Sequence, residues 1–218
     1  PQGGIISPLL SNLYLNEVDE MMERAREVTR SKGYENLDFI RSADDMVILV
    51  HWHPKEDWIL QKVQKRHKEE LDKLEVEMNL EKTKVVDLKK GGSFSFLGFD
   101  FRFTRNREGK AYVSKTPRKK KCIEIGKRVR AVLKTNRNNP LKEVIQAVNG
   151  VIRGWVNYFR IGNSSSAFSK VRNDLEMKVR KFGLRRKKLK GFGWKRWSRE
   201  EIYGKWGLYD EYRIRYVY

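Results

Sequence analysis

The first half of the chain alternates between helical and strand-like patterns of apolar residues. Apolar side chains recur every three or four positions over residues 9–22, behind the start signal Ser7–Pro8, and predict a helix there. Residues 39–50 hold two short apolar runs around a polar centre, the pattern of a β-hairpin. Apolar positions spaced by threes and fours from residue 54 to residue 79 then predict one amphipathic helix packed on a sheet.

Strand-like alternation continues after that helix. A polar turn at 106–109 separates the last two strand segments. Together these elements predict an α+β first part of the chain, in which helices pack on a sheet. The predicted strand segments are 81–86, 94–101 and 111–113.

After Pro117 the apolar residues recur only at helical spacing. Three apolar stripes predict three helices, so the second part of the chain is expected to be all-α. We place the boundary between the two parts at 104–117, and Gly183 is expected to end the last helix. The three stripes cover residues 125–133, 141–159 and 168–182.

The charges divide the chain in the same way. Among 218 residues, 48 Lys and Arg stand against 28 Asp and Glu, a net charge of +20. Residues 1–98 hold 15 basic and 18 acidic side chains, whereas residues 99–218 hold 33 and 10. The second part therefore carries the whole surplus and predicts a polyanionic partner. Nucleic acid is favoured over an anionic membrane, because no long amphipathic helix is flanked by a lipid anchor.

Composition excludes several classes of protein. With 39% hydrophobic residues and 25 aromatic side chains, the chain is neither a disordered polar tail nor a membrane protein. No leader opens it, so a soluble, cytoplasmic location is expected. Its single cysteine, Cys122, excludes an internal disulfide. The chain starts at Pro1 in what looks like the middle of a fold, which suggests a piece of a longer protein.

Two adjacent carboxylates, Asp44 and Asp45, lie at the tip of the predicted hairpin. The hairpin arms are apolar enough that we expect them to be buried. Like charges there are costly unless a cation or solvent reaches them, and hard oxygen ligands suit Mg²⁺. A solvated Asp-Asp turn is the alternative. Upstream, Gln2, Gly3 and Gly4 would let backbone approach a nucleotide closely, and downstream Lys82 offers an ammonium for a phosphate.

The order and spacing of these motifs resemble the group II intron-encoded reverse transcriptases, which are also maturases. Residues 2–12 resemble the nucleotide-pocket motif of reverse transcriptases, and Arg41-Ser42-Ala43-Asp44-Asp45 resembles their catalytic hairpin. The resemblance covers nearly the entire chain in the order of the family. Its further motifs are 79–83 and 96–99 in the first part, 149–159 in the maturase domain and 205–209 near the end.

The resemblance implies an α+β fold in which a partial polymerase palm precedes an all-α basic thumb or maturase domain. The palm, an antiparallel sheet with packed helices, would cover residues 1–103, a connection 104–117 and the thumb 118–218. The implied activity is RNA-directed DNA polymerisation, a nucleotidyl transfer with Mg²⁺ and deoxynucleotides, together with assistance to intron splicing. A third aspartate and the fingers would lie outside this chain, which is therefore expected to be inactive alone.

Site residues follow from the same resemblance. Asp44 and Asp45 match the paired aspartates that hold two Mg²⁺ ions for catalysis. Gln2, Gly3, Gly4 and Lys82 match residues around the incoming nucleotide, and Leu97 and Gly98 match the turn that steadies the primer end.

Partners follow as well: group II intron RNA, an RNA template with a DNA primer, and deoxynucleotides, but no membrane. Arg153 and Arg160 lie off the apolar stripe of their helix and are RNA-binding candidates, whereas Trp155 and Tyr158 are expected in the core. The remaining RNA-binding candidates are Arg118, Lys119, Lys120, Lys121, Arg185, Arg186, Lys187 and Lys188.

Alternatives stay open for the function and the oligomeric state. The family usually has a tyrosine where this chain has Ser42. That departure favours a second hypothesis, a non-catalytic RNA-binding splicing factor with a degenerate polymerase scaffold. A third is sequence-tolerant DNA binding.

Overall fold

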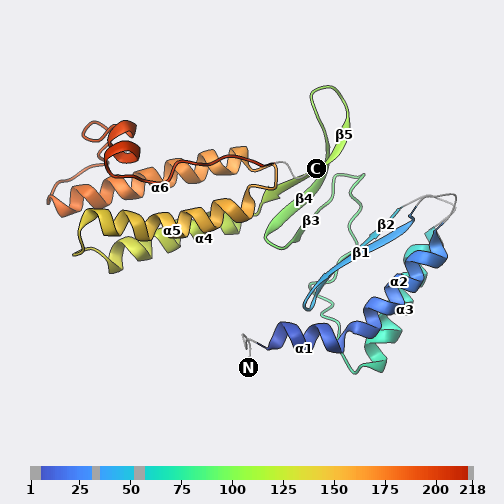
Figure 1. Ribbon diagram of the computed structural model, residues 1–218. Coiled ribbons are helices and arrows are strands. Elements are labelled where there is room, and N and C mark those ends of the chain that lie inside the picture. Colours follow the sequence, from blue (N-terminus) through green and yellow to red (C-terminus); the bar gives the residue numbers. More distant parts are fainter. Residues whose placement is uncertain (1–5, 31–34, 52–56, 216–218) are drawn as a thin grey trace. The chain divides into compact units, whose positions relative to one another are not determined.

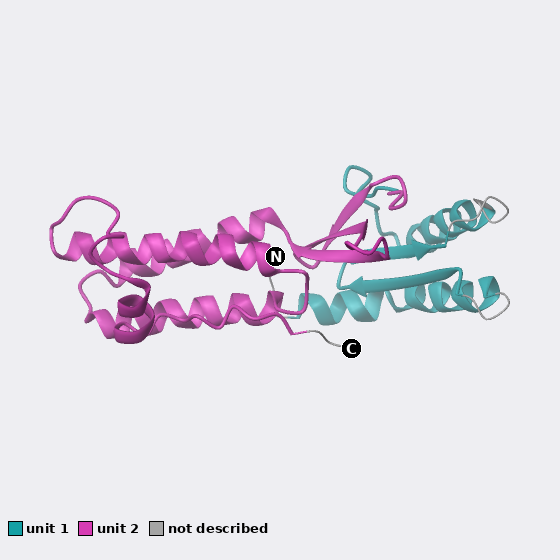
Figure 2. Ribbon diagram, turned by 90° about the horizontal axis from the view of Figure 1, so that it is seen from above, with its two compact units in different colours: residues 1–85 teal, residues 86–218 magenta. Residues whose placement is uncertain are grey.

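The computed structural model describes residues 6–30, 35–51 and 57–215 (Figure 1). The chain forms two compact units, Pro1–Val85 and Val86–Tyr218 (Figure 2). We call them the first and the second unit. The three strands that follow residue 85 belong to the same compact unit as the downstream helices. The functional boundary expected at 104–117 remains a prediction. Within the described parts of the chain, no helix combines the length and apolarity needed to cross a bilayer.

The first unit packs helices on one β-hairpin. Apolar residues of the second and third helices and the first strand form its core: Val18, Met21, Met22, Leu37, Ile59, Val63 and Leu71. The single helix predicted over 9–22 is two helices that meet at Leu15. The elements are α1 Ser7–Tyr14, α2 Asn16–Thr29, β1 Leu37–Ser42, β2 Asp45–Val50 and α3 Asp57–Lys73.

Within the described residues of the first unit, helices cover one face of the hairpin. Because strand side chains alternate in direction, Phe39 and Ile48 face the helices, while Ile40 and Leu49 lie on the other face. Ile40 is 50% exposed and Leu49 38% exposed, so the expectation that both arms are buried was wrong. Both faces are apolar, which is why the sequence pattern resembled that of a fully buried strand pair.

The segment after α3 also differs from the prediction. The helix ends at Lys73 rather than near residue 79, and Glu75 has a φ of +53°. Residues 81–86 do not form a strand, because Asn79 organises a turn. Its carbonyl oxygen accepts hydrogen bonds from the backbone N–H groups of Lys82 and Thr83 at 3.2 and 3.0 Å. Its side-chain oxygen accepts a second bond from the Lys82 N–H at 3.1 Å.

The second unit joins a three-stranded sheet to a three-helix bundle. The sheet is antiparallel with the order β3-β4-β5. The predicted strand at 94–101 is in fact two strands of a tight hairpin that turns at Leu97 and Gly98. The elements are β3 Ser93–Phe96, β4 Phe99–Arg105, β5 Ala111–Pro117, α4 Lys119–Thr135, α5 Leu141–Phe159, α6 Ser165–Arg186 and the short π-helix η2 Glu201–Lys205.

The bundle core takes in the C-terminal segment. The inner faces of α4, α5 and α6 bury side chains such as Val129, Ile152 and Leu175, and Trp197 and Tyr209 belong to the same cluster. The helix α6 continues through Gly183, where we expected it to end. A Cβ at Gly183 would lie 2.8 Å from the ring of Trp206 and 3.0 Å from that of Trp197. Glycine is therefore required there for close packing and does not act as a helix stop.

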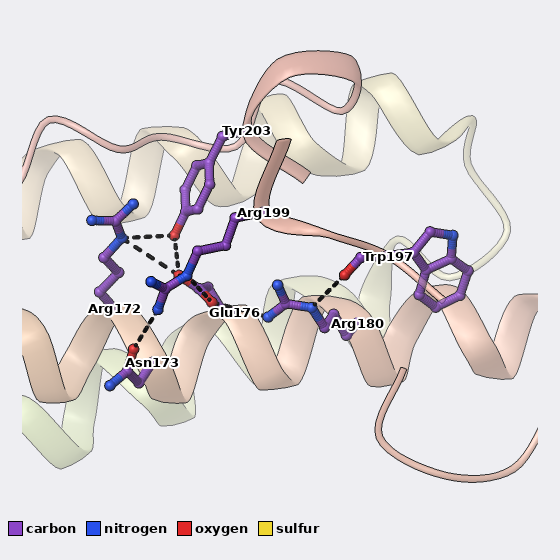
Figure 3. Close-up of polar contacts among 7 residues, drawn as sticks. All are labelled: Arg172, Asn173, Glu176, Arg180, Trp197, Arg199 and Tyr203. Carbon is purple, nitrogen blue, oxygen red and sulfur yellow. Dashed lines mark hydrogen bonds and ion pairs between the residues drawn. The ribbon is translucent and has the colours of Figure 1, made fainter. Parts of the chain in front are cut away.

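A buried carboxylate fixes the C-terminal segment to α6 (Figure 3). Glu176 is fully buried; it accepts a hydrogen bond from the Tyr203 hydroxyl at 2.7 Å and pairs with the guanidinium of buried Arg180 at 3.0 Å. The Arg199 side chain donates at 3.2 Å, and Arg172 lies 3.4 Å away. Burial alone would raise the pKa of Glu176. Hydrogen bonds from Tyr203, Arg180 and Arg199 outweigh it, and the pKa lies below its ordinary value of 4.5.

Glu176→Gln should destabilise the second unit in a pH-dependent manner. A carboxyl with a lowered pKa in the folded state stabilises above its unfolded pKa of 4.5 and loses that contribution as the pH falls. Since the substitution leaves Arg180 buried without its counter-charge, we expect the free energy of unfolding at pH 7 to fall by about 3 kcal/mol. The gap to wild type should narrow below pH 4.5.

Urea unfolding at several pH values measures both effects. The control is Glu143→Gln, which removes an exposed carboxylate of α5. A loss that does not depend on pH, or one matched by the control, would show that the buried charge does not hold the segment.

Candidate functional site

The two candidate catalytic carboxylates lie at the tip of the β1–β2 hairpin. Ser42 pairs with Asp45, so Ala43 and Asp44 form a two-residue turn. Ala43 has a φ of +56°, the left-handed conformation that such turns require. Asp44 and Asp45 are both exposed. The structure thus presents two adjacent carboxylates to solvent on a short turn.

Arg41 anchors this turn to the helices. Its guanidinium makes a two-point ion pair with Asp19 of α2, with one hydrogen bond of 2.8 Å, and its side chain is only 9% exposed. The same group donates to the side-chain oxygen of Asn12 at 3.0 Å and to the carbonyl oxygen of Ala43 at 2.9 Å. The hydrogen bond to Asp19 raises the pKa of Arg41, partly opposed by burial. The sequence pattern did not predict this role, although Arg41 stands three residues before Asp44.

The carboxylate pair fits a magnesium ion by its donor chemistry. Mg²⁺ prefers oxygen ligands and usually keeps several waters while binding one or two carboxylates and substrate phosphates. Exposed Asp44 and Asp45 leave room for such ligands. Among the described residues, no group of three or more His, Cys, Asp or Glu side chains converges on one point. The pair would therefore supply only part of a coordination shell.

The predicted nucleotide-binding residues are placed unequally. Gln2, Gly3 and Gly4 lie outside the described residues. Lys82 lies on the Asn79 turn with its side chain exposed, and its ammonium forms no ion pair within the described part of the chain. Lys82 belongs to the same unit as Asp44 and Asp45.

The predicted primer turn lies beside the predicted basic cluster in the second unit. Leu97 and Gly98 have φ values of +47° and +78°. The backbone N–H of Arg118 donates to the Gly98 carbonyl at 2.9 Å. A Cβ at Gly98 would lie 3.6 Å from the side chain of Lys121. The first turn of α4 therefore brings the side chain of Lys121 against this hairpin turn.

Tyr158 of α5 completes the support of this turn. Its hydroxyl donates to the Leu97 carbonyl at 2.8 Å, and its ring stacks on Phe99 with centroids 5.8 Å apart. The side chain is 51% exposed, so its prediction as a core residue was wrong. Trp155, one turn earlier, is partly buried and packs on Phe159 and Phe168. Tyr158 lies at the edge of the apolar stripe of α5. The spacing of apolar residues in the sequence does not distinguish the edge of such a stripe from its centre.

The two predicted basic clusters differ in their electrostatic setting. Arg118, Lys119, Lys120 and Lys121 occupy the N-terminal cap and first turn of α4, where no acidic residue is present. The positive end of the helix dipole disfavours cations there. Arg185, Arg186, Lys187 and Lys188 lie at the C-terminal end of α6, where the dipole favours them.

Three of the predicted RNA-binding residues differ in the contacts that they make within the fold. Arg186 donates to the carbonyl oxygens of Arg137, at 3.2 Å, and Asn139. Arg153 is exposed, with its guanidinium 5.9 Å from the centre of the Tyr209 ring. Arg160 is half-buried at the end of α5, and its Nε has no hydrogen-bond partner among the described residues.

Two family models match separate parts of the chain. Residues 1–101 match the family model of the reverse transcriptase (RNA-dependent DNA polymerase). Residues 124–203 match that of the group II intron maturase-specific domain. A relative is Protein YkfC of Escherichia coli (strain K12), which is 27% identical over 157 residues, 61% of this chain and 40% of that protein. The chain thus spans less than half the length of this relative. The two matches in this order show that the chain belongs to the group II intron reverse transcriptase/maturase family.

Proposed function

We propose that the protein containing this chain is an RNA-directed DNA polymerase and a maturase that assists splicing of a group II intron. One observation carries the proposal. A solvent-exposed aspartate pair on an anchored hairpin turn and a strongly basic helical unit occur in one chain, in the regions that match the two family models. Residues 1–103 would act as the palm, 104–117 as a connection and 118–218 as the thumb.

The aspartates would act as metal ligands in nucleotidyl transfer. Bound Mg²⁺ would stabilise the charge on the attacking and leaving oxygens. Asp44 and Asp45 would hold it, and their exposure leaves access for the substrate phosphates. Arg41 is a positioning residue, because its bond to the Ala43 carbonyl fixes the backbone between the two strands. Gln2, Gly3, Gly4 and Lys82 would contact the incoming nucleotide.

The basic cluster at the start of α4 supports nucleic-acid binding. Four successive residues at the positive end of α4 are cationic, and the helix dipole disfavours them there. Lys121 pairs with Glu124 at 3.0 Å, whereas Arg118, Lys119 and Lys120 make no ion pair within the described part of the chain. A phosphate backbone would compensate both the cations and the dipole. The neighbouring Leu97–Gly98 turn would place the primer end against these contacts.

A non-catalytic splicing factor is the second candidate. Ser42 pairs with Asp45 in the position where the family usually has a tyrosine. The two candidates differ in whether the protein synthesises DNA with these aspartates.

Asp44→Asn in the full-length protein should abolish primer extension on an RNA template. Removal of one carboxylate lowers the affinity for the cation, and we expect the rate to fall by at least about 100-fold. The control is Asp72→Asn on the exposed surface of α3. Extension that survives the substitution would contradict the catalytic assignment of Asp44, whereas a wild-type protein that extends no primer would favour the non-catalytic factor.

Arg41→Lys should weaken the hairpin anchor while keeping its charge. Lysine cannot reproduce the two-point pair with Asp19, and loss of charged hydrogen bonds should lower the free energy of unfolding by about 2 kcal/mol. In the full-length protein, kcat for primer extension should fall while the KM for the nucleotide stays constant. Arg26→Lys, whose pair with Glu23 is exposed, is the control. Unchanged kcat would contradict the positioning role.

RNA binding by this chain should weaken steeply with salt. Each phosphate neutralised by Lys or Arg releases counterions, and six such contacts would reduce affinity about 1,000-fold between about 50 and 200 mM salt. Filter binding or fluorescence anisotropy at several salt concentrations measures the slope. A flat response would contradict an electrostatic interface.

A further inference from the structure

A groove runs between α4 and α6 in the second unit. It is open to solvent and has a volume of about 350 Å³. Small, apolar and cationic residues of both helices line it. The lining residues are Lys119, Cys122, Ile123, Gly126, Lys127 and Arg130 of α4, and Lys170, Val171, Asp174 and Lys178 of α6.

The groove carries uncompensated positive charge. Five of its lining residues are basic and one is acidic. Asp174 forms an ion pair with Lys178, which neutralises that lysine. The other four cations make no ion pair within the described part of the chain: Lys119, Lys127, Arg130 and Lys170. All four are exposed, so the fold does not need them for its stability.

Gly126 shapes the floor of the groove. A Cβ at this position would lie 2.7 Å from the carboxylate of Asp174 and 3.3 Å from the ammonium of Lys178. The absence of a side chain lets the ion pair lie directly against the α4 backbone. Ile123, which also lines the groove, is 51% exposed.

The cations on α4 form a row along the helix. Lys119, Lys127 and Arg130 are separated by eight and three residues. At a rise of 1.5 Å per residue, the row spans about 16 Å of the helix axis. That length suits several successive phosphates of one nucleic-acid strand better than a single small anion.

We propose that the groove between α4 and α6 binds the phosphodiester backbone of RNA. This inference rests on the proposed function and deepens it by naming a surface for the RNA. The row extends the predicted cluster at the start of α4 along the helix. Exposed Ile123 would pack on the sugars between phosphates.

Cys122 provides a direct test of occupancy. It is the only cysteine of the chain, and its half-buried thiol lies in the groove, so alkylation reports on this site alone. The probe is an RNA hairpin without a primer end. At an RNA concentration about ten times the Kd, alkylation should slow about tenfold, because only free protein reacts. Unchanged alkylation with bound RNA, or protection only by an RNA–DNA duplex, would overturn the proposal.

A charge-matched pair of variants separates the groove from general electrostatics. Lys127→Gln/Arg130→Gln/Lys170→Gln should reduce the magnitude of the negative slope of log K against log salt by about 2 to 3, as expected for three lost phosphate contacts. It should also abolish the protection of Cys122. The control, Lys65→Gln/Arg66→Gln/Lys68→Gln, removes three exposed cations of α3.

The outcomes distinguish the two proposals. If the wild-type chain binds RNA with a steep salt dependence but both triple variants behave alike, the groove proposal is wrong and the proposed function stands. If the wild-type chain does not bind RNA, the maturase function fails and the groove proposal fails with it.

Discussion

The second unit depends on a single buried carboxylate. Residues 99–218 carry 33 basic and 10 acidic side chains, yet Arg180 lies inside the fold with 1% exposure. A buried guanidinium is tolerable only with a hydrogen-bonded counter-charge, which Glu176 provides. Because Glu176 also binds Tyr203 and Arg199, the same carboxylate joins α6 to the C-terminal segment. Neutralising one internal cation thus fixes the architecture, and the surplus remains on the surface.

The cations of the chain then separate by what the fold does with them. The guanidinium of Arg41 pairs with the carboxylate of Asp19, and that of Arg186 donates to backbone carbonyl oxygens. Removal of either side chain would therefore disturb the structure. Lys119 and Lys127 have no such partners, and Lys119 opposes the dipole of its helix. We assign to RNA the exposed cations that make no ion pair within the described part of the chain. The near-neutral first unit, by contrast, presents its aspartates on a turn that Arg41 holds in place.

Sequence patterns located most elements but not their faces. The apolar stripe at 141–159 correctly predicted α5, because apolar residues at helical spacing over so many residues are compatible only with an amphipathic helix. The strand expected at 81–86 was wrong because a side chain–backbone turn at Asn79 overrides weak alternation. The predictions for Tyr158 as a core residue and Gly183 as a helix end were wrong because contacts distant in sequence decide their roles. Tyr158 bonds to Leu97, and Gly183 packs against Trp206. The groove was missed because its cations come from two helices, and contiguous runs of charge drew attention to 118–121 and 185–188.

We infer that the basic unit holds RNA while the first unit carries the aspartate pair. Ultraviolet crosslinking of the chain to bound RNA, followed by mass spectrometry of the peptides, tests it most directly. We expect the crosslinked peptides to come mainly from α4, α6 and the turn between β3 and β4. Crosslinks confined to α2 and α3 of the first unit would contradict the account.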